Sequence, residues 1–71
     1  MSKSNYTAVV TRDGDWWIGW IEEIPGVNCQ EMSREALLQG LSETLAEILE
    51  MNRSDALSAA GDSYEEIAIS I

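Results

Sequence analysis

One amphipathic stretch, from Ser33 to Asn52, does most to constrain the fold of this chain. At about 100° per residue, its apolar side chains fall within an arc of roughly 120°, the width of a stripe that faces a core. The stripe consists of Leu37, Leu38, Leu41, Leu45, Ile48 and Leu49. Ser33 is a suitable N-cap because its hydroxyl can accept from a free amide of the first turn. The pattern predicts one helix from about Arg34 to Met51, with Asn52 as its stop.

Gly40 lies at the edge of this stripe and has two readings. As an ordinary helix position it costs about 1 kcal/mol relative to alanine. Alternatively, it marks a point where the helix approaches a strand closely. Neither reading gives Gly40 a functional role.

The segments before the helix have the composition of β-strands. Tyr6 to Arg12 and Trp16 to Ile21 are rich in β-branched and aromatic residues, and Asp13-Gly14-Asp15 between them is a turn sequence. Pro25-Gly26 forms a second tight turn, and Val27 to Glu31 follows as a short third strand. Three sequential strands most simply form an antiparallel meander.

The segment after the helix predicts a return to the sheet. Residues 53–62 read as a connection, with one helical turn around 55–60 and an end at Gly61-Asp62. From Tyr64 to Ile71 the isoleucines alternate with small residues, which is the period of a strand. We expect this fourth strand to lie parallel to one of the first three, through a right-handed crossover. The order β-β-β-α-β predicts an α+β fold in two layers, with one helix packed on the sheet.

The three tryptophans of the second strand are informative because one helix covers only one face of a sheet. Trp16 and Trp20 point to one side and Trp17 to the other. At least one ring therefore lies on the uncovered face, either as an exposed ring or packed against a loop of the chain. The alternative is an interface, since tryptophan is enriched at binding hot spots. We take Trp16, Trp17 and Trp20 as candidates for an oligomer or partner interface.

The chain length favours self-association. The 71 residues allow one domain, 1–71, and a domain of this size buries only about 60% of its unfolded surface. With one cysteine and no histidine, a disulfide or metal staple is not expected, and oligomerisation is the remaining common way to add buried area. We expect a dimer or a larger assembly.

The cysteine count and the absence of long apolar runs indicate the compartment. Cys29 alone suits a reducing compartment or a plain buried thiol. The first ten residues lack a signal-peptide pattern, and no stretch approaches the roughly 20 apolar residues of a membrane span. We predict a cytoplasmic protein without a membrane partner.

The chain is strongly acidic, with 13 acids against four bases and a formal charge of −9. Its basic residues are scattered along the sequence, so they form no patch that would bind phosphates. Direct binding of nucleic acid is therefore not expected. The acidity serves either solubility or attraction to a basic partner.

The sequence lacks the usual groups of an active site. No histidine is present as a general base or metal ligand, and Cys29 has no histidine to activate it. Asp13 and Asp15 flank a turn glycine, where turn chemistry explains them. We expect no catalytic residue, no metal and no cofactor, and hence no enzyme.

Between Tyr6 and Asn52 the sequence resembles the HicB family, the antitoxin half of HicA–HicB toxin–antitoxin pairs. The segments that carry the resemblance are YTAVV, DGDWWIGWI, IPGVNCQ and SREALLQGLSETLAEILEMN. Pro25-Gly26 and Glu35-Ala36 stand where the family has a Pro-Gly turn and a helix opening with Glu-Ala. The resemblance implies a partial RNase H-like fold without nuclease activity.

The chain also departs from the family pattern in two ways. It ends at Ile71 without the C-terminal DNA-binding segment that HicB antitoxins commonly have, and Glu31-Met32-Ser33 stands where the family often has a Gly-Asp-Thr-like run. The resemblance implies a short HicB-like antitoxin, or a solitary relative, whose partner would be a small basic HicA-type mRNA-cleaving toxin. The alternative is a self-associating, non-catalytic module with no toxin partner.

Overall fold

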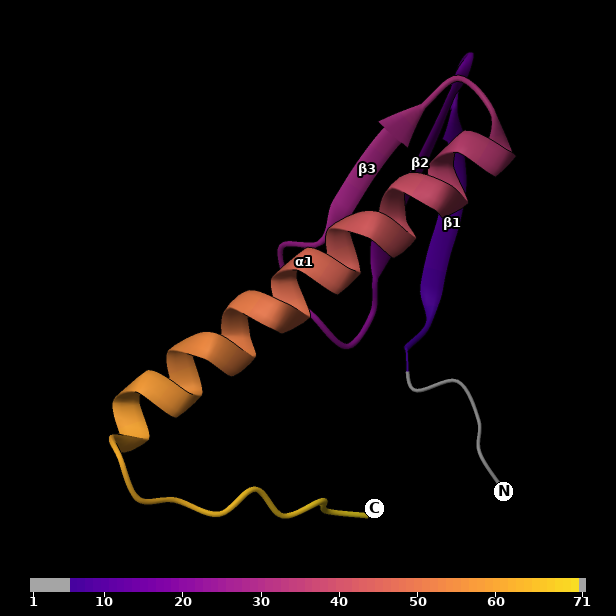
Figure 1. The fold of residues 1–71 in the computed structure, drawn as a ribbon. Helices are drawn as coiled ribbons and strands as arrows, with labels where there is room; N and C mark the ends of the chain where they lie inside the picture. The colour runs from indigo at the N-terminus through magenta and orange to yellow at the C-terminus, as the bar shows by residue number, and fades with distance from the viewer. Residues whose placement is uncertain (1–5, 71) are drawn as a thin grey trace.

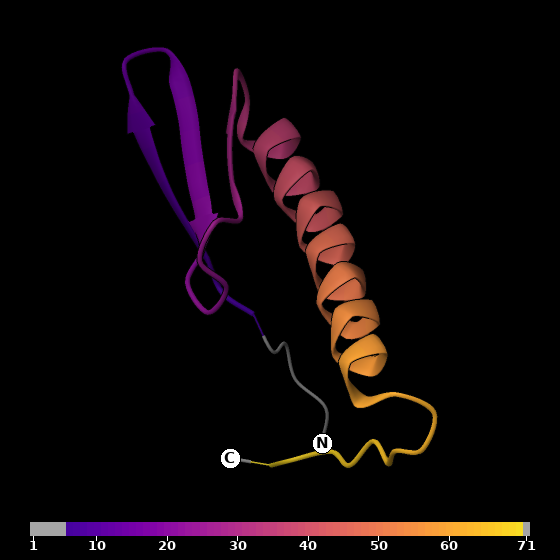
Figure 2. The same ribbon diagram turned by 90° about the vertical axis from the view of Figure 1, so that its left-hand side faces the viewer.

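The computed structural model describes residues 6–70, which form three strands followed by one helix. The strands are β1 (Ala8–Asp13), β2 (Trp16–Ile21) and β3 (Asn28–Glu31), and the helix is α1 (Arg34–Ala60). Figure 1 shows α1 crossing one face of the sheet, and Figure 2 shows helix and sheet as two separate layers. The α+β class and the single covering helix are as the sequence predicts.

The sheet is an antiparallel meander in the order β1-β2-β3. Its register places Gly19, at the middle of β2, opposite Val10 of β1 and Cys29 of β3. The turn between β1 and β2 has two residues, and Gly14 takes a φ of 63° while Asp15 keeps a negative φ. Positive φ at the first central residue alone is the pattern of a type II′ turn, which suits the twist of a hairpin.

The loop between β2 and β3 is held by a second tight turn. The Val27 amide donates to the carbonyl of Ile24 (3.4 Å), with Pro25 and Gly26 as the central residues. Gly26 has a φ of 93°, so this is a type II turn, which requires positive φ at its second central position. The Ile21 amide donates to the Val27 carbonyl (3.0 Å) and closes the loop. The predicted Pro-Gly turn is confirmed.

The core lies between α1 and the two strands that it covers, β2 and β3. Among the described residues, the buried apolar side chains there are those of Ile21, Val27, Leu37 and Leu41. A β-carbon on Gly19 would lie 3.0 Å from Leu41 Cδ1 and 3.1 Å from Leu37 Cδ2, so α1 approaches the sheet most closely at this glycine. Gly40 faces β3 as well, but a β-carbon there would lie 3.4 Å from Cys29 Sγ, an ordinary contact.

The helix begins where the sequence predicts and ends later. Ser33 is the N-cap, and its Oγ accepts from the Ala36 amide (3.1 Å). The helix does not stop at Asn52 but continues to Ala60, where Gly61 has a φ of 88° and donates its amide to the Leu57 carbonyl (3.2 Å). The predicted connection is therefore helical, because its alanines and Leu57 favour a helix and Asn52 does not break one. Within residues 6–70, no helix is both long and apolar enough to cross a membrane.

The predicted fourth strand is wrong over its described part. Residues Tyr64–Ser70 pair with no strand of the described chain, while Ile71 and the polar lead, residues 1–5, lie outside the described residues. At about 1.5 Å per residue, the 27 residues of α1 span about 40 Å. A six-residue strand spans only about 20 Å. The helix therefore carries the chain past the end of the sheet, and no crossover back to it forms.

Candidate protein-interaction site on the open face of the sheet

The close approach of α1 at Gly19 shows which face of the sheet is covered. Side chains alternate along a strand, so Trp17, Gly19 and Ile21 face the helix. The register then defines the opposite side, here called the open face. Its residues are Val9, Thr11 and Asp13 of β1, Trp16, Ile18 and Trp20 of β2, and Asn28 and Gln30 of β3.

Two tryptophans dominate the open face. Trp16 and Trp20 are each 42% exposed, and Ile18 and Val9 between and beside them are half-buried. Four residues of strand separate the two indoles by about 13 Å. The side chains around them are polar, and one of them, Asp13, is charged. An apolar centre with a polar rim is the arrangement of a protein-binding surface.

Trp17 lies on the other face and packs against the core. The guanidinium carbon of Arg12 lies 4.7 Å from the centroid of the Trp17 ring, a cation–π distance. Arg12 and Trp17 are also cross-strand partners. Of the three candidate tryptophans, the structure therefore places Trp16 and Trp20 on the same face of the sheet and Trp17 on the other.

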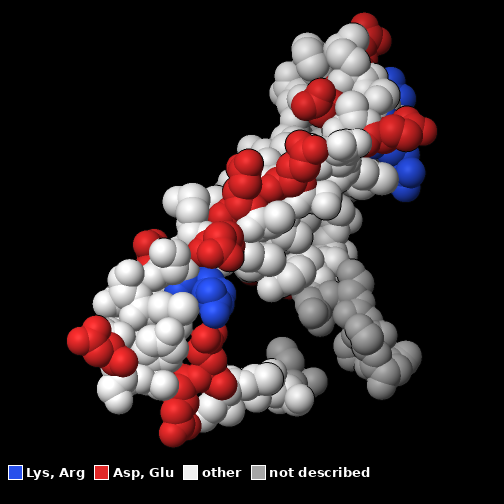
Figure 3. Space-filling model, in the orientation of Figure 1, with Lys and Arg blue, Asp and Glu red and all other residues white. Residues whose placement is uncertain are grey.

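A second surface is formed by acidic residues on the outer side of α1. Glu43, Glu47 and Glu50 are spaced four and three residues apart and are all exposed, so they form one row, here called the acidic row. Figure 3 shows acidic groups following the length of the helix. The Gln39 amide donates to Glu43 Oε2 (3.1 Å), and no lysine or arginine stands between Glu35 and Asn52. The row is thus a strip of uncompensated negative charge.

Cys29 occupies a structural position between β3 and α1. It is a partly buried free thiol, and its Sγ lies 3.8 Å from Thr44 Oγ1. Among residues 6–70, no three side chains of His, Cys, Asp or Glu gather in a way that could hold a metal ion. Asp13 and Asp15 lie at the hairpin turn.

One carboxylate has a distinct role in fixing the start of the sheet. The Thr7 hydroxyl and the Thr7 backbone amide donate to the two carboxylate oxygens of Glu23, each at 2.7 Å. These two hydrogen bonds lower the pKa of Glu23 below its ordinary value, the hydroxyl bond more than the amide bond. Glu23 thus ties the residue before β1 to the loop after β2.

A glycine inside β2, Gly19, indicates from the sequence which face of the strand the helix covers. A glycine in the interior of a strand often marks close approach of another element, and Gly19 stands between Ile18 and Trp20. If Gly19 faces the helix, the alternation of side chains puts Trp16, Ile18 and Trp20 on the open face. Ile18 and Val9 were missed for this reason.

Comparison with known proteins found no matching family model, no matching curated protein and no matching solved structure.

Proposed function

We propose that the chain is a non-catalytic protein-binding domain, a HicB-like antitoxin or a solitary relative, that binds and neutralises a small basic HicA-type mRNA-cleaving toxin. The observation that carries this proposal is the open face with Trp16 and Trp20. These are large rings held by a rigid sheet on the side that the chain's own helix does not cover. Family resemblance supplies the name of the partner, and the physical chemistry of the surface supplies the mode of binding.

The open face would provide most of the affinity. Tryptophans at the centre of an interface are frequent hot spots, and their burial removes a large apolar area from water. Because a tryptophan side chain has only two torsions, little side-chain freedom is lost when it binds. Ile18, half-buried between them, completes an apolar centre.

The acidic surface would provide attraction and selectivity. A basic ribonuclease carries positive charge to hold RNA phosphates, and a domain of charge −9 competes for that charge. Complementary charges mainly raise the association rate and exclude wrong partners. The acidic row, Glu43, Glu47 and Glu50, is one exposed part of this charge.

The finer points of the proposal follow from the same resemblance. The two-layer arrangement of three antiparallel strands and one helix would be a partial RNase H-like fold. The domain would act in the cytoplasm by occupying the RNA-binding surface of the toxin, without a cofactor and without contacting nucleic acid itself.

The test is binding of the purified chain to a HicA-type protein encoded beside its gene, measured by calorimetry and by inhibition of RNA cleavage. The double variant Trp16→Ala/Trp20→Ala should bind about 30-fold more weakly or worse, since hot-spot truncations cost about 2 kcal/mol or more. Met51→Ala, a change at an exposed apolar residue of α1 and outside the open face, is the matched control and should bind as the unmodified chain does. Absence of binding, or equal affinity of the double variant, would overturn the proposal.

The charge argument has its own test in the same assay. Replacing Glu43, Glu47 and Glu50 by glutamine should slow association and flatten its dependence on salt, with a smaller change in dissociation. If association is unchanged by these substitutions and by salt, the acidic row serves solubility alone.

A second candidate function is a self-associating module without a toxin partner. The observation that favours it is the exposure of Ile67 and Ile69 in the segment after the helix. The absence of any HicA-type reading frame beside the gene would favour this candidate over the first.

A further inference from the structure

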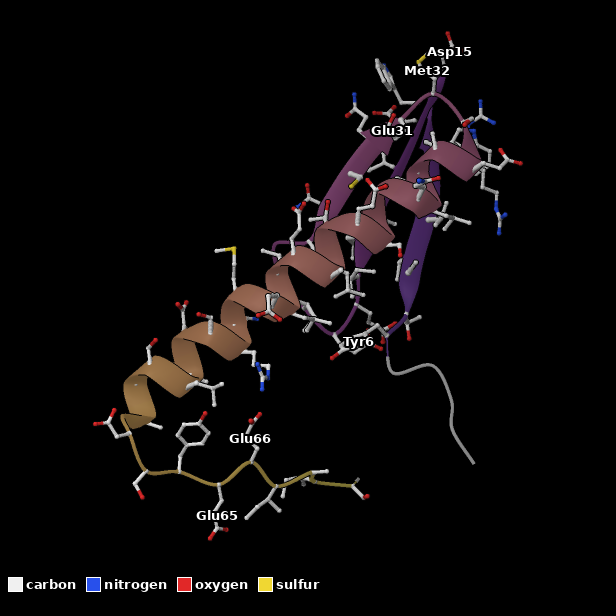
Figure 4. All side chains as sticks on the ribbon, viewed as in Figure 1. Tyr6, Asp15, Glu31, Met32, Glu65 and Glu66 are labelled. Carbon is white, nitrogen blue, oxygen red and sulfur yellow. The ribbon has the colours of Figure 1, made fainter. Side chains whose placement is uncertain are left out.

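The segment after α1 has the side-chain pattern of a strand but pairs with no strand of the described chain. This segment, residues 62–70, is here called the C-terminal arm. Figure 4 shows Glu66 pointing toward α1 and Glu65 pointing away from it. Ile67 and Ile69, two and four residues after Glu65, are 70% and 80% exposed. Within the described chain the arm pairs with no strand, and these two isoleucine side chains are left largely uncovered.

Little in the described chain holds the arm where it lies. Arg53 Nη2 is 3.1 Å from Glu66 Oε2, and both side chains are about half exposed. Exposed ion pairs of this kind add little stability and weaken with salt. The arm can therefore exchange this position for a better one at small cost.

The sheet offers a strand edge of matching length. β1 is a six-residue strand that, among the described residues, pairs only with β2, and α1 packs on β2 and β3. Every second residue of β1 therefore directs its backbone amide and carbonyl away from the sheet, and such an edge is a template for another strand. The other edge, β3, has four residues and leads directly into the helix.

We propose that the C-terminal arm adds as a strand to the β1 edge of a second copy of this chain. The helix carries the start of the arm about 16 Å past Leu49, its last residue before an exposed stretch, since residues 50–60 rise about 1.5 Å each. Figures 1 and 2 show the arm turning back below the end of the sheet, and it pairs with no described strand of its own copy. When a second copy lies beside the end of α1, its β1 pairs with the arm. Each sheet then has four strands.

Charge favours an antiparallel orientation of the added strand. Arg12 stands near the end of β1, and Glu65 and Glu66 stand near the start of the arm. Antiparallel pairing brings these acids beside Arg12, whereas parallel pairing places them beside Ala8, which has no charge. Ile67 then lies opposite Val10 or Thr11, depending on which of the two glutamates faces Arg12.

The exchange is reciprocal, so the assembly closes as a dimer. Each copy donates one arm and offers one β1 edge, which is the self-complementary arrangement of a two-fold interface. The dimer uses the strand edges and leaves Trp16 and Trp20 on the open faces. The inference thus goes beyond the proposed function and does not depend on it.

The first test is the mass in solution by light scattering at micromolar concentration. The unmodified chain should be a dimer, and Ile67→Glu/Ile69→Glu should be a monomer with unchanged helical content by circular dichroism. Met32→Glu, at 64% exposure, is the matched control and should remain a dimer. A monomeric unmodified chain, or a dimer that survives the double variant, would overturn the inference.

The second test locates the contact by disulfide formation and does not depend on how a variant affects stability. In a Cys29→Ala background, a chain with Val10→Cys or Thr11→Cys is mixed with a differently tagged chain carrying Ile67→Cys. One of the two mixtures should give a disulfide between the two tags under mild oxidation. Failure of both, or a disulfide within one chain when both cysteines are on the same copy, would show that the arm does not bind a second copy.

Salt separates this inference from the proposed function. Two copies each carry a charge of −9, so screening reduces their repulsion and should strengthen the dimer. Binding of a basic toxin should weaken under the same conditions. A dimer that dissociates with added salt would contradict the arm-exchange interface even if toxin binding is found.

Discussion

The two parts of α1 differ in what keeps them helical. The packed part, residues 34–49, buries Leu37 and Leu41 against the sheet and half-buries Leu45 and Ile48. The overhang, residues 50–60, is exposed except for Leu57, which is half-buried. One continuous helix thus contains a part stabilised by tertiary contacts and a part stabilised by its own sequence. The comparison shows that helix length and helix stability are set by different residues in this chain.

The overhang persists because it extends a helix that already exists. Starting a helix costs much more than adding a residue to one, and the packed part provides the start. Ala56, Leu57, Ala59 and Ala60 favour extension, and Gly61 ends it with a hydrogen bond to Leu57. A peptide of the overhang alone would be too short to stay helical in water.

The largest expected difference between the two parts is in the loss of a leucine side chain. Leu37→Ala should lower the free energy of unfolding by about 2–5 kcal/mol, because Leu37 is fully buried and its removal leaves a cavity. Leu57→Ala should cost less than about 1 kcal/mol, since its side chain is only half-buried and lies outside the core. Urea denaturation followed by tryptophan fluorescence measures both. Equal losses would show that the overhang is as tightly packed as the rest.

A pair of glycines tests where the packed part touches the sheet. Gly19→Ala should cost about 1–3 kcal/mol, because the new methyl meets Leu37, Leu41 and the Val9 carbonyl at about 3 Å. Gly40→Ala should be neutral or stabilise by up to about 1 kcal/mol, since alanine favours a helix and its methyl comes no closer to another residue than 3.4 Å, at Cys29 Sγ. The same denaturation assay compares them, and a stabilising Gly19→Ala would mean that the helix stands farther from β2.

Two exposed alanines distinguish local from global unfolding. Ala46→Gly in the packed part and Ala56→Gly in the overhang each lose about 1 kcal/mol of helix propensity. We expect the first to lower global stability and the second to reduce amide protection only within the overhang, which opens without the rest of the molecule. Hydrogen exchange measured by NMR distinguishes global unfolding from local opening of the overhang. Slow exchange throughout the overhang of the unmodified chain would contradict this expectation.

The smallest effect concerns the tie between Thr7 and Glu23. The pKa of Glu23 is lowered in the folded chain from its ordinary value of 4.5 by the two hydrogen bonds from Thr7. The ionised Glu23 carboxylate therefore contributes its full stabilisation at a pH above the pKa of the unfolded chain. This stabilisation is lost as the pH falls through the lower pKa of the folded chain. An NMR titration of the Glu23 carboxyl should show the depressed pKa, and Thr7→Val should return it toward 4.5 while leaving the fold intact. An ordinary pKa in the unmodified chain would mean that the bonds do not persist in solution.

The contrast between local and distant information also explains what the sequence could predict. The strands, both turns and the Ser33 cap depend on neighbouring residues, and these predictions are confirmed. The alternation in 64–71 also depends on neighbours, but a strand needs a partner, and alternation does not say whether one is within reach. The prediction of a fourth strand is wrong for this reason. The predicted end of the helix is wrong because Asn52 is a weak stop inside a segment that favours a helix.

The candidate site, like the fold, was predicted from the sequence only where it depends on neighbouring residues. Alternation along β2 established that Trp16 and Trp20 share a face that Trp17 does not. Which face the helix covers depends on the fit of leucines over Gly19, a contact between residues about 20 positions apart. Periodicity within one strand holds no information about that contact.

The overhang also fixes the direction in which the chain leaves the domain. Each helical residue adds about 1.5 Å of rise and about 100° of rotation, so the eleven residues 50–60 set both the height and the phase of the C-terminal arm. Removing one residue would rotate the exit by about 100° and shift it by less than 2 Å. Removing seven, close to two full turns, would draw the exit inward by about 10 Å with nearly the same orientation. The overhang thus acts as a spacer, and the number of its helical turns determines how far from the sheet the C-terminal arm begins.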